Sequence, residues 1–190
     1  VPLHLQMARA WRVPARCHDA LRQALVLCAD IVGNLMSLAG RMMASVQGSL
    51  AACLLSTMGY SFIRLSGGEF EAVEALFDEV QAAGSFDAVA SSYRVRGETL
   101  PGFNHVLFVA GDPRATALLQ LATALGSEAT SWLPATQRAQ QPMNPTLDFG
   151  LVALRRAMKA PRHAPLTMTY AARAAGMLAL LILVWSGVMA

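Results

Sequence analysis

Apolar residues recur every three or four positions along most of this chain, and turn-forming residues separate the runs. The clearest run follows a Gly-Gly pair and places its apolar side chains on one face of a helix: Phe70, Val73, Leu76, Phe77 and Val80. Gly84 follows that run, in the position of a residue that ends a helix. Because this period differs from the alternation of a half-buried strand, we predict an all-α fold.

Composition narrows the class of protein. The 190 residues suffice for one domain or for two closely packed ones. Apolar residues make up 55% and charged residues 14%, against averages of about 45–50% and about 25%. So much apolar surface requires a large core or a subunit interface. The net charge of +3 and the scattered 15 lysines and arginines argue against a nucleic-acid-binding surface.

The three cysteines, Cys17, Cys28 and Cys53, are far apart and odd in number. No CxxC pair and no His/Cys cluster has the spacing of a metal site, so we predict three reduced thiols and no bound metal. The sequence begins with no charged-then-apolar leader, and we therefore expect a cytoplasmic protein.

Two later helices are predicted to begin by the same device, a polar capping residue followed by proline. Asp112 caps the first helix and Pro113 starts it, whereas Asn144 caps the second and Pro145 starts it. The second helix is predicted to end at the prolines within residues 161–165. Between the earlier run and these helices, we predict a polar connector that contains a short helix.

Four polar residues are candidates for a functional site. His105 follows a glycine-containing turn, where a ligand can approach the backbone closely. Arg114 lies in the first turn of a predicted helix, a favourable position for gripping a carboxylate. Asp148 lies in a first turn among apolar neighbours, which can tune a carboxylate as a general base. Arg173 is the single charge in an apolar helix and must be paired if it is buried.

Each candidate also has a purely structural interpretation. Asp148 can stabilise the dipole of its helix, Arg114 can be a solvated surface residue, and His105 can be a hydrogen-bonded loop residue. The four together are harder to explain in this way.

Three segments carry a resemblance to a known family: "LPGFNHVLFVAGDPRATALLQLA", "NPTLDFGLVALRRAM" and "AARAAGMLA". They are similar to the GFGHPLYPDGDPRA, NVDFALAAL and GRTAGWLAH segments of the citrate synthase family in its compact bacterial form. Residues 24–34 and 49–80 resemble two further family segments. All five occur in the family's order with matching spacing, so the resemblance covers nearly the whole chain.

The resemblance implies an all-helical dimer that condenses an acyl-CoA, usually acetyl-CoA, with a 2-oxo acid, usually oxaloacetate. It divides the chain into large-domain helices over 1–66, a small domain over 67–143, and a return to an incomplete large domain over 144–190. No cofactor is expected, because acetyl-CoA is a substrate.

The resemblance also implies a role for each candidate residue. Asp148 would be the base that removes a methyl proton, and His105 would polarise the ketone. Arg114 and Arg173 would hold the carboxylates of the substrate. The adenine of CoA would lie beside the backbone of a short segment: Gly102, Phe103 and Asn104.

Two histidines of the family are replaced in this chain. Ser66 stands at the position of the enol-stabilising histidine, and Ile31 stands at the position of a substrate-binding one. Because losing one preorganised donor costs roughly 10²–10³ in rate, we expect a weak or inactive acyltransferase. The alternative is a non-catalytic homologue that binds a ligand or a partner subunit. The family's final segment, whose arginine reaches the partner's site, has no counterpart here, so we expect pairing with a second copy or with a fuller homologue.

The last helix is predicted to begin near Leu166. Residues 174–190 carry no charge. The length of this stretch is at the lower limit of the ~17–25 residues that a membrane span needs. Arg173 and the family resemblance favour a packed helix over a membrane anchor.

Overall fold

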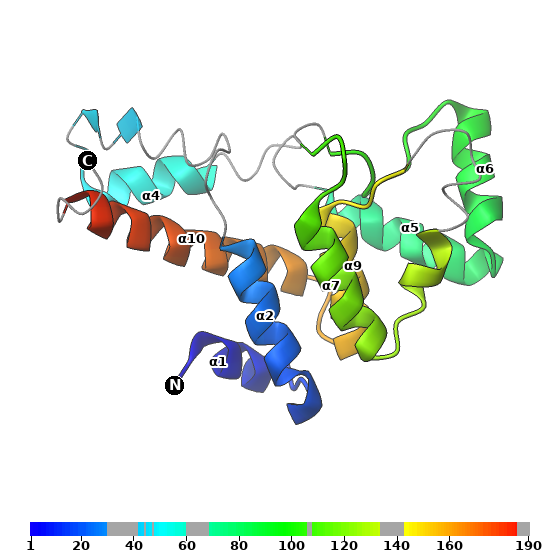
Figure 1. The fold of residues 1–190 in the computed structure, drawn as a ribbon, viewed down its shortest axis with the longest axis horizontal. Coiled ribbons are helices and arrows are strands. Elements are labelled where there is room, and N and C mark those ends of the chain that lie inside the picture. The colour runs from blue at the N-terminus through cyan, green and yellow to red at the C-terminus, as the bar shows by residue number, and fades with distance from the viewer. Residues whose placement is uncertain are drawn as a thin grey trace. The chain divides into compact units, whose positions relative to one another are not determined.

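The computed structural model describes residues 1–29, 42–43, 45–46, 48–59, 69–105, 108–133 and 143–185. Over these residues the chain forms α-helices and short 3-10 helices and contains no β-strand (Figure 1). In chain order the elements are α1 (Leu3–Ala10), η1 (Ala15–Cys17), α2 (His18–Cys28), α4 (Leu50–Gly59), α5 (Phe70–Ala83), α6 (Phe86–Arg96), α7 (Pro113–Ala124), η4 (Ala129–Trp132), α9 (Leu147–Met158) and α10 (Ala164–Trp185). The predicted all-α fold is confirmed.

The chain forms two compact units. The first unit comprises Val1–Ala20 and Glu69–Pro165, and the second comprises Leu21–Gly68 and Leu166–Ala190. Each unit therefore joins segments that are distant in the sequence. The division into large-domain and small-domain segments stays a prediction.

Helices α7 and α9 pack against each other in the first unit (Figure 1). Gly150 of α9 permits this close approach, because an added Cβ would lie 2.9 Å from the Cβ of Leu118 and 3.3 Å from the carbonyl oxygen of Ala115. Fully buried leucines on the two helices include Leu118, Leu151 and Leu154. Burying each such side chain contributes about 1.5–3 kcal/mol, so this pair is a firm platform for the loops that precede both helices.

Five aromatic rings form a cluster in the first unit: Phe77, Phe86, Phe103, Trp132 and Phe149. The ring centroid of Phe149, on α9, lies 5.1 Å from that of Phe77 and 4.8 Å from that of Phe103. Such tilted pairs add about 0.5–1.5 kcal/mol beyond the burial of their area. The cluster therefore holds the loop that contains Phe103 against α6 and α9.

An ion-pair network joins α5 to α9. The Nε atoms of Arg155 and Arg156 donate to the carboxylate of Glu74 at 2.7 and 2.9 Å, and Glu74 is only 3% exposed. Arg156 and Arg162 also pair with Asp78. The hydrogen bond from Arg156 holds the pKa of Asp78 below its ordinary value. These contacts link residues that lie about eighty positions apart in the sequence.

Helices α4 and α10 and most of α2 belong to the second unit. An added Cβ on Gly176 of α10 would lie 2.4 Å from the carbonyl oxygen of Ala29, so glycine is required for this contact between α10 and the end of α2. Cys28 and Cys53 are buried cysteines outside any disulfide in this unit, and Cys17 is a third in the other unit. Of the helices that the structure describes, none is long and apolar enough to cross a membrane.

The starts of α7 and α9 differ, although their sequences predict the same device. Asp112 caps α7 and Pro113 is its first residue, as predicted. Helix α9 begins at Leu147 with Thr146 as its N-cap residue. The prediction that Asn144 caps this helix is therefore wrong by two residues, because Asn144 is engaged with a distant loop, described below.

The ends of the predicted helices also shift. Helix α9 ends at Met158, where Lys159 takes a left-handed conformation before either proline is reached. Helix α10 begins at Ala164, so Pro165 lies in its first turn and does not end the preceding helix. Proline fits this position because the first turn leaves its N–H groups without intrahelical partners. The predicted short helix in the polar connector is α6, which Ser85 caps.

Candidate functional site

The loop that leads to His105 is built on Gly102, which has a positive φ of 81°. An added Cβ would lie 2.9 Å from a methyl carbon of Val73 and 3.1 Å from the Cβ of Phe149. The N–H of Gly102 donates to the carboxylate of Glu69 at 3.2 Å. Glycine is thus required here because protein side chains pack against it, whereas the sequence suggested close approach by a ligand.

Two asparagines join this loop to the segment before α9. The N–H of Asn104 donates to the carbonyl oxygen of Asn144 at 2.8 Å, and the N–H of Asn144 donates to the side-chain oxygen of Asn104 at 3.1 Å. The side-chain amide of Asn144 also donates to the carbonyl oxygen of Val109 at 3.1 Å. The next contact along is a backbone bridge between Phe103 and Pro145. These bonds place the chain leading to Asp148 beside the chain leading to His105.

The ring of Phe108 lies between His105 and Arg114 and contacts both. The ring centroids of His105 and Phe108 are 5.2 Å apart, and the guanidinium carbon of Arg114 lies 4.9 Å from the centroid of Phe108. The phenyl ring therefore contacts both candidate residues, and its negative face favours the guanidinium cation.

Arg114 is held by a buried carboxylate two residues before it. Its Nε and Nη2 atoms donate to the two oxygens of Asp112 at 2.9 and 2.8 Å, and its backbone N–H donates to the same side chain at 3.0 Å. The side chain of Asp112 is fully buried, and that of Arg114 is 14% exposed. Asp112 thus caps α7 and fixes the guanidinium together. The sequence identified only the first of these roles, although the Asp-Pro-Arg spacing signals both.

Asp148 lies in the first turn of α9 and is 7% exposed. Its chain neighbours Leu147 and Phe149 are buried, as the sequence predicted. A carboxylate in these surroundings has lost most of its water, which is the environment of a general base.

The side chain of Phe103 is buried, whereas that of Asn104 is exposed to solvent. The ring of Phe103 packs in the aromatic cluster, so its side chain belongs to the core. Asn104 is exposed and has a positive φ of 58°. A nucleotide at this segment would therefore contact backbone and Asn104, and the predicted role of this segment in binding CoA stays a prediction.

Arg173 lies in α10, in the second unit, and is 8% exposed. Burial of the nearby Tyr170 raises the pKa of its phenol, and the positive charge of Arg173 offsets part of this increase. Ser66 and Ile31 lie outside the described residues.

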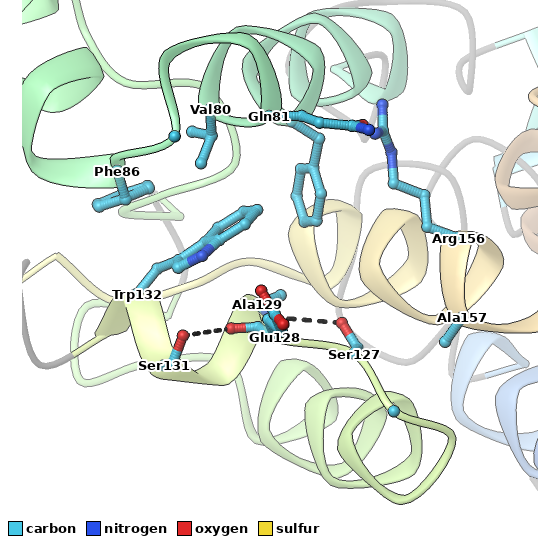
Figure 2. A pocket seen from close by; sticks show the side chains of 13 residues that line it. Val80, Gln81, Phe86, Ser127, Glu128, Ala129, Ser131, Trp132, Arg156 and Ala157 are labelled. Atoms are coloured by element: carbon cyan, nitrogen blue, oxygen red, sulfur yellow. Dashed lines mark hydrogen bonds between the residues drawn. The ribbon is translucent and has the colours of Figure 1, made fainter.

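The first unit contains an open pocket of about 700 Å³, and Figure 2 shows the side chains that line it. Its walls include the rings of Phe86 and Trp132, which stack at 5.6 Å, and two serines whose hydroxyl groups bond within their own turn. None of the predicted site residues lines this cavity. Within the described part of the chain, no group of three or more His, Cys, Asp and Glu side chains is arranged to hold a metal ion.

Comparison with known proteins decides the family. The sequence profile described as "Citrate synthase, C-terminal domain" matches residues 3–184. The chain belongs to the citrate synthase family. A protein named "Putative citrate synthase 2" in Mycobacterium bovis and Mycobacterium tuberculosis is 34% identical over 109 residues. That match spans 57% of this chain and 29% of the length of the mycobacterial relative.

Solved structures show the citrate synthase fold. Citryl-CoA lyase from Hydrogenobacter thermophilus has a TM-score of 0.82 at 17% identity, covering 96% of this chain and 76% of the lyase. Citrate synthase from Thermotoga maritima has a TM-score of 0.71 at 21% identity, covering 86% of this chain and 49% of that enzyme. Citrate synthase from Thermoplasma acidophilum, solved as a ternary complex with carboxymethyl coenzyme A and oxaloacetate, has a TM-score of 0.70 at 20% identity over 87% of this chain and 49% of that enzyme. The chain thus spans about half the length of these two citrate synthases.

Proposed function

We propose that this chain binds an acyl-CoA and a 2-oxo dicarboxylate and condenses them as citrate synthases do, with acetyl-CoA and oxaloacetate as the first substrates to test. One observation carries this proposal: the paired segments 102–104 and 144–146 hold the chain leading to His105 beside the chain leading to Asp148. These two residue types at neighbouring positions suit proton removal from one substrate and polarisation of the other.

The first step of the proposed reaction belongs to Asp148. Its carboxylate takes a proton from the methyl group next to the thioester carbonyl, and the carbon of the resulting enolate attacks the ketone carbon of the 2-oxo acid. His105 gives a proton to the ketone oxygen as the carbon–carbon bond forms. Hydrolysis of the thioester then releases CoA. Asp148 is a buried carboxylate in the first turn of α9, and this protected position supports the role.

Arg114 and Arg173 are proposed to bind the two carboxylates of the 2-oxo acid. Arg114 is suited to the task, because Asp112 and Phe108 hold its guanidinium in one orientation. Asp112 takes the Nε–Nη2 edge of this guanidinium, so a substrate carboxylate would bind the other edge, formed by Nη1 and Nη2. Two such cations select a dicarboxylate over a monocarboxylate. A second copy or a fuller homologue as partner, and a cytoplasmic location, belong to the same proposal.

A second candidate function is binding without turnover. Ser66 and Ile31 favour it, because each stands where the family places a histidine that contacts the reacting groups. A serine hydroxyl can donate a hydrogen bond but reaches less far than an imidazole, so a bridging water would have to span the difference. Isoleucine offers no donor at all.

The experiment that tests both functions is release of CoA thiol from acetyl-CoA and oxaloacetate. We expect slow release that Asp148→Asn abolishes. Asp87→Asn is the matched control, since Asp87 is an exposed carboxylate in the first turn of α6 and should leave the rate unchanged. The double variant Ser66→His with Ile31→His should raise the rate by roughly 10²–10³.

The outcomes separate the two candidates. Release that Asp148→Asn does not alter would overturn the proposed reaction. Stabilisation of the parent chain by oxaloacetate, without release in either the parent or the double variant, would establish binding alone.

A further inference from the structure

Thr146 holds a buried hydroxyl group that the fold itself does not use. The residue is 5% exposed, and its Oγ1 atom has no hydrogen-bond partner among the residues that the structure describes. Thr146 is the N-cap residue of α9, where a threonine normally accepts a bond from the N–H two or three residues on. Its side chain makes no such bond.

An unpaired buried hydroxyl is a destabilising group. Transfer of a hydroxyl from water into a protein interior without a partner costs free energy, and nearly all such groups in native proteins are satisfied. Valine has almost the same shape as threonine and carries no such cost. The presence of threonine at this position is therefore best explained by a partner that is not one of the described protein residues.

The position of Thr146 indicates which partner this is. Its backbone N–H donates to the carbonyl oxygen of Gly102 at 2.9 Å, in the segment proposed to lie beside CoA. Asp148, the proposed base, follows two residues later. Thr146 thus lies in the chain next to both parts of the proposed site: its backbone bonds the 102–104 segment, and Asp148 is two residues away. It does not bond Asp148 in this structure, since Oγ1 has no partner.

We propose that the hydroxyl of Thr146 is a positioning donor for the acyl-CoA and donates to one of its acyl or amide oxygens. This inference rests on the proposed function, because it takes Asp148 to act on that substrate. A hydroxyl donates to a carbonyl oxygen, whereas the neighbouring carboxylate can only accept when ionised. The two groups therefore have complementary tasks: Thr146 orients the thioester and Asp148 takes its methyl proton.

The test uses the full chain and the substitutions Thr146→Val and Thr146→Ser. Thr146→Val should raise the urea midpoint of unfolding, because it removes an unpaired buried hydroxyl. The same variant should weaken acetyl-CoA binding, measured by calorimetry, about fivefold to tenfold, which is the loss of one hydrogen bond. Thr146→Ser should retain the parent's affinity. Oxaloacetate binding should be unchanged in both.

Thr123→Val is the control, because the hydroxyl of Thr123 donates to the carbonyl oxygen of Leu119 at 2.8 Å. It should not raise the urea midpoint and should leave acetyl-CoA binding unchanged. A parent chain that binds acetyl-CoA, with Thr146→Val binding equally well, would overturn the inference and leave the proposed function standing. A parent chain that binds neither substrate would overturn both. A lower urea midpoint for Thr146→Val, with unchanged affinity in Thr146→Ser and Thr146→Val, would assign the hydroxyl a structural role instead.

Discussion

Helices α7 and α9 begin with similar sequences, Asp-Pro and Asn-Pro, and use them differently. At α7 the polar residue caps the helix, and the same carboxylate fixes Arg114 two residues on. At α9 the polar residue bonds a loop forty positions earlier, and the helix starts two residues late. The contacts at the start of α7 are local, between residues two positions apart, whereas those at the start of α9 join segments that are distant in the sequence.

The difference has a physical cause. Every helix leaves N–H groups in its first turn that need a partner, and the nearest polar side chain normally supplies it. Asn144 instead satisfies the carbonyl oxygen of Val109 and pairs with Asn104. Helix α9 therefore has no side-chain cap, whereas the loop carrying His105 is held by the bonds of Asn144. Irregularity at α9 is a cost of assembling the candidate site.

The largest expected effect comes from breaking the start of α7. Asp112→Ala should lower the free energy of unfolding by about 4 kcal/mol, because it removes the helix cap and the buried carboxylate that faces Arg114. Urea denaturation measures this change. A loss below about 1 kcal/mol would mean that Asp112 is no more than an ordinary cap.

The loop beside the start of α9 should be the next most sensitive. Gly102→Ala should cost about 3 kcal/mol, because alanine adds both a strained positive φ and a clash with Val73. Gly97→Ala is the matched comparison, since Gly97 has a φ of 70° and open space around it, and strain alone should cost about 1 kcal/mol. Equal losses in denaturation experiments would show that packing against Gly102 is unimportant.

The asparagine at the start of α9 should matter less for stability than for the loop. Asn144→Ala removes the side-chain bond to Val109 and keeps the backbone bonds, so we expect a loss of about 1 kcal/mol. Hydrogen exchange at the N–H of Asn104 should become faster, because the segment that accepts its bond is less firmly held. Unchanged exchange would mean that the backbone pairing alone holds the loop.

An exposed carboxylate sharpens the contrast with Asp112. Asp78→Asn removes a partner of Arg156 and Arg162 but should cost less than about 1 kcal/mol near neutral pH, since the side chain of Asp78 is 45% exposed. The arginines lower the pKa of Asp78, so its contribution is present above the ordinary value of 3.8 and is lost as pH falls through the lower value in the folded state. Stability curves of the parent and the variant should therefore converge in acid. A difference that persists below about pH 2 would contradict this.

Much of the fold and of the candidate site could be predicted from sequence. The apolar stripe of α5, from Phe70 to Val80, is buried as predicted. Asp112 caps α7, and Gly84 ends α5 in a left-handed conformation, as their residue types indicated. Asp148 was correctly placed in a buried first turn. The roles of His105, Arg114, Asp148 and Arg173 stay predictions. The start of α9 could not be predicted, because capping preferences describe a helix in isolation and Asn144 is engaged with another segment.

The sequence by itself determined the helical class, the apolar faces and the chemical groups available, because these depend on residue type and on spacing of three or four positions. The tertiary structure alone decided which groups met. Glu74 pairs with Arg155, 81 positions away, and Asn104 bonds Asn144, forty positions away. Thr146 is buried with no hydrogen-bond partner for its hydroxyl among the described residues. Spacing within one helix carries no information about contacts between helices. Such contacts follow from how whole surfaces pack, as Gly150 against Leu118 illustrates.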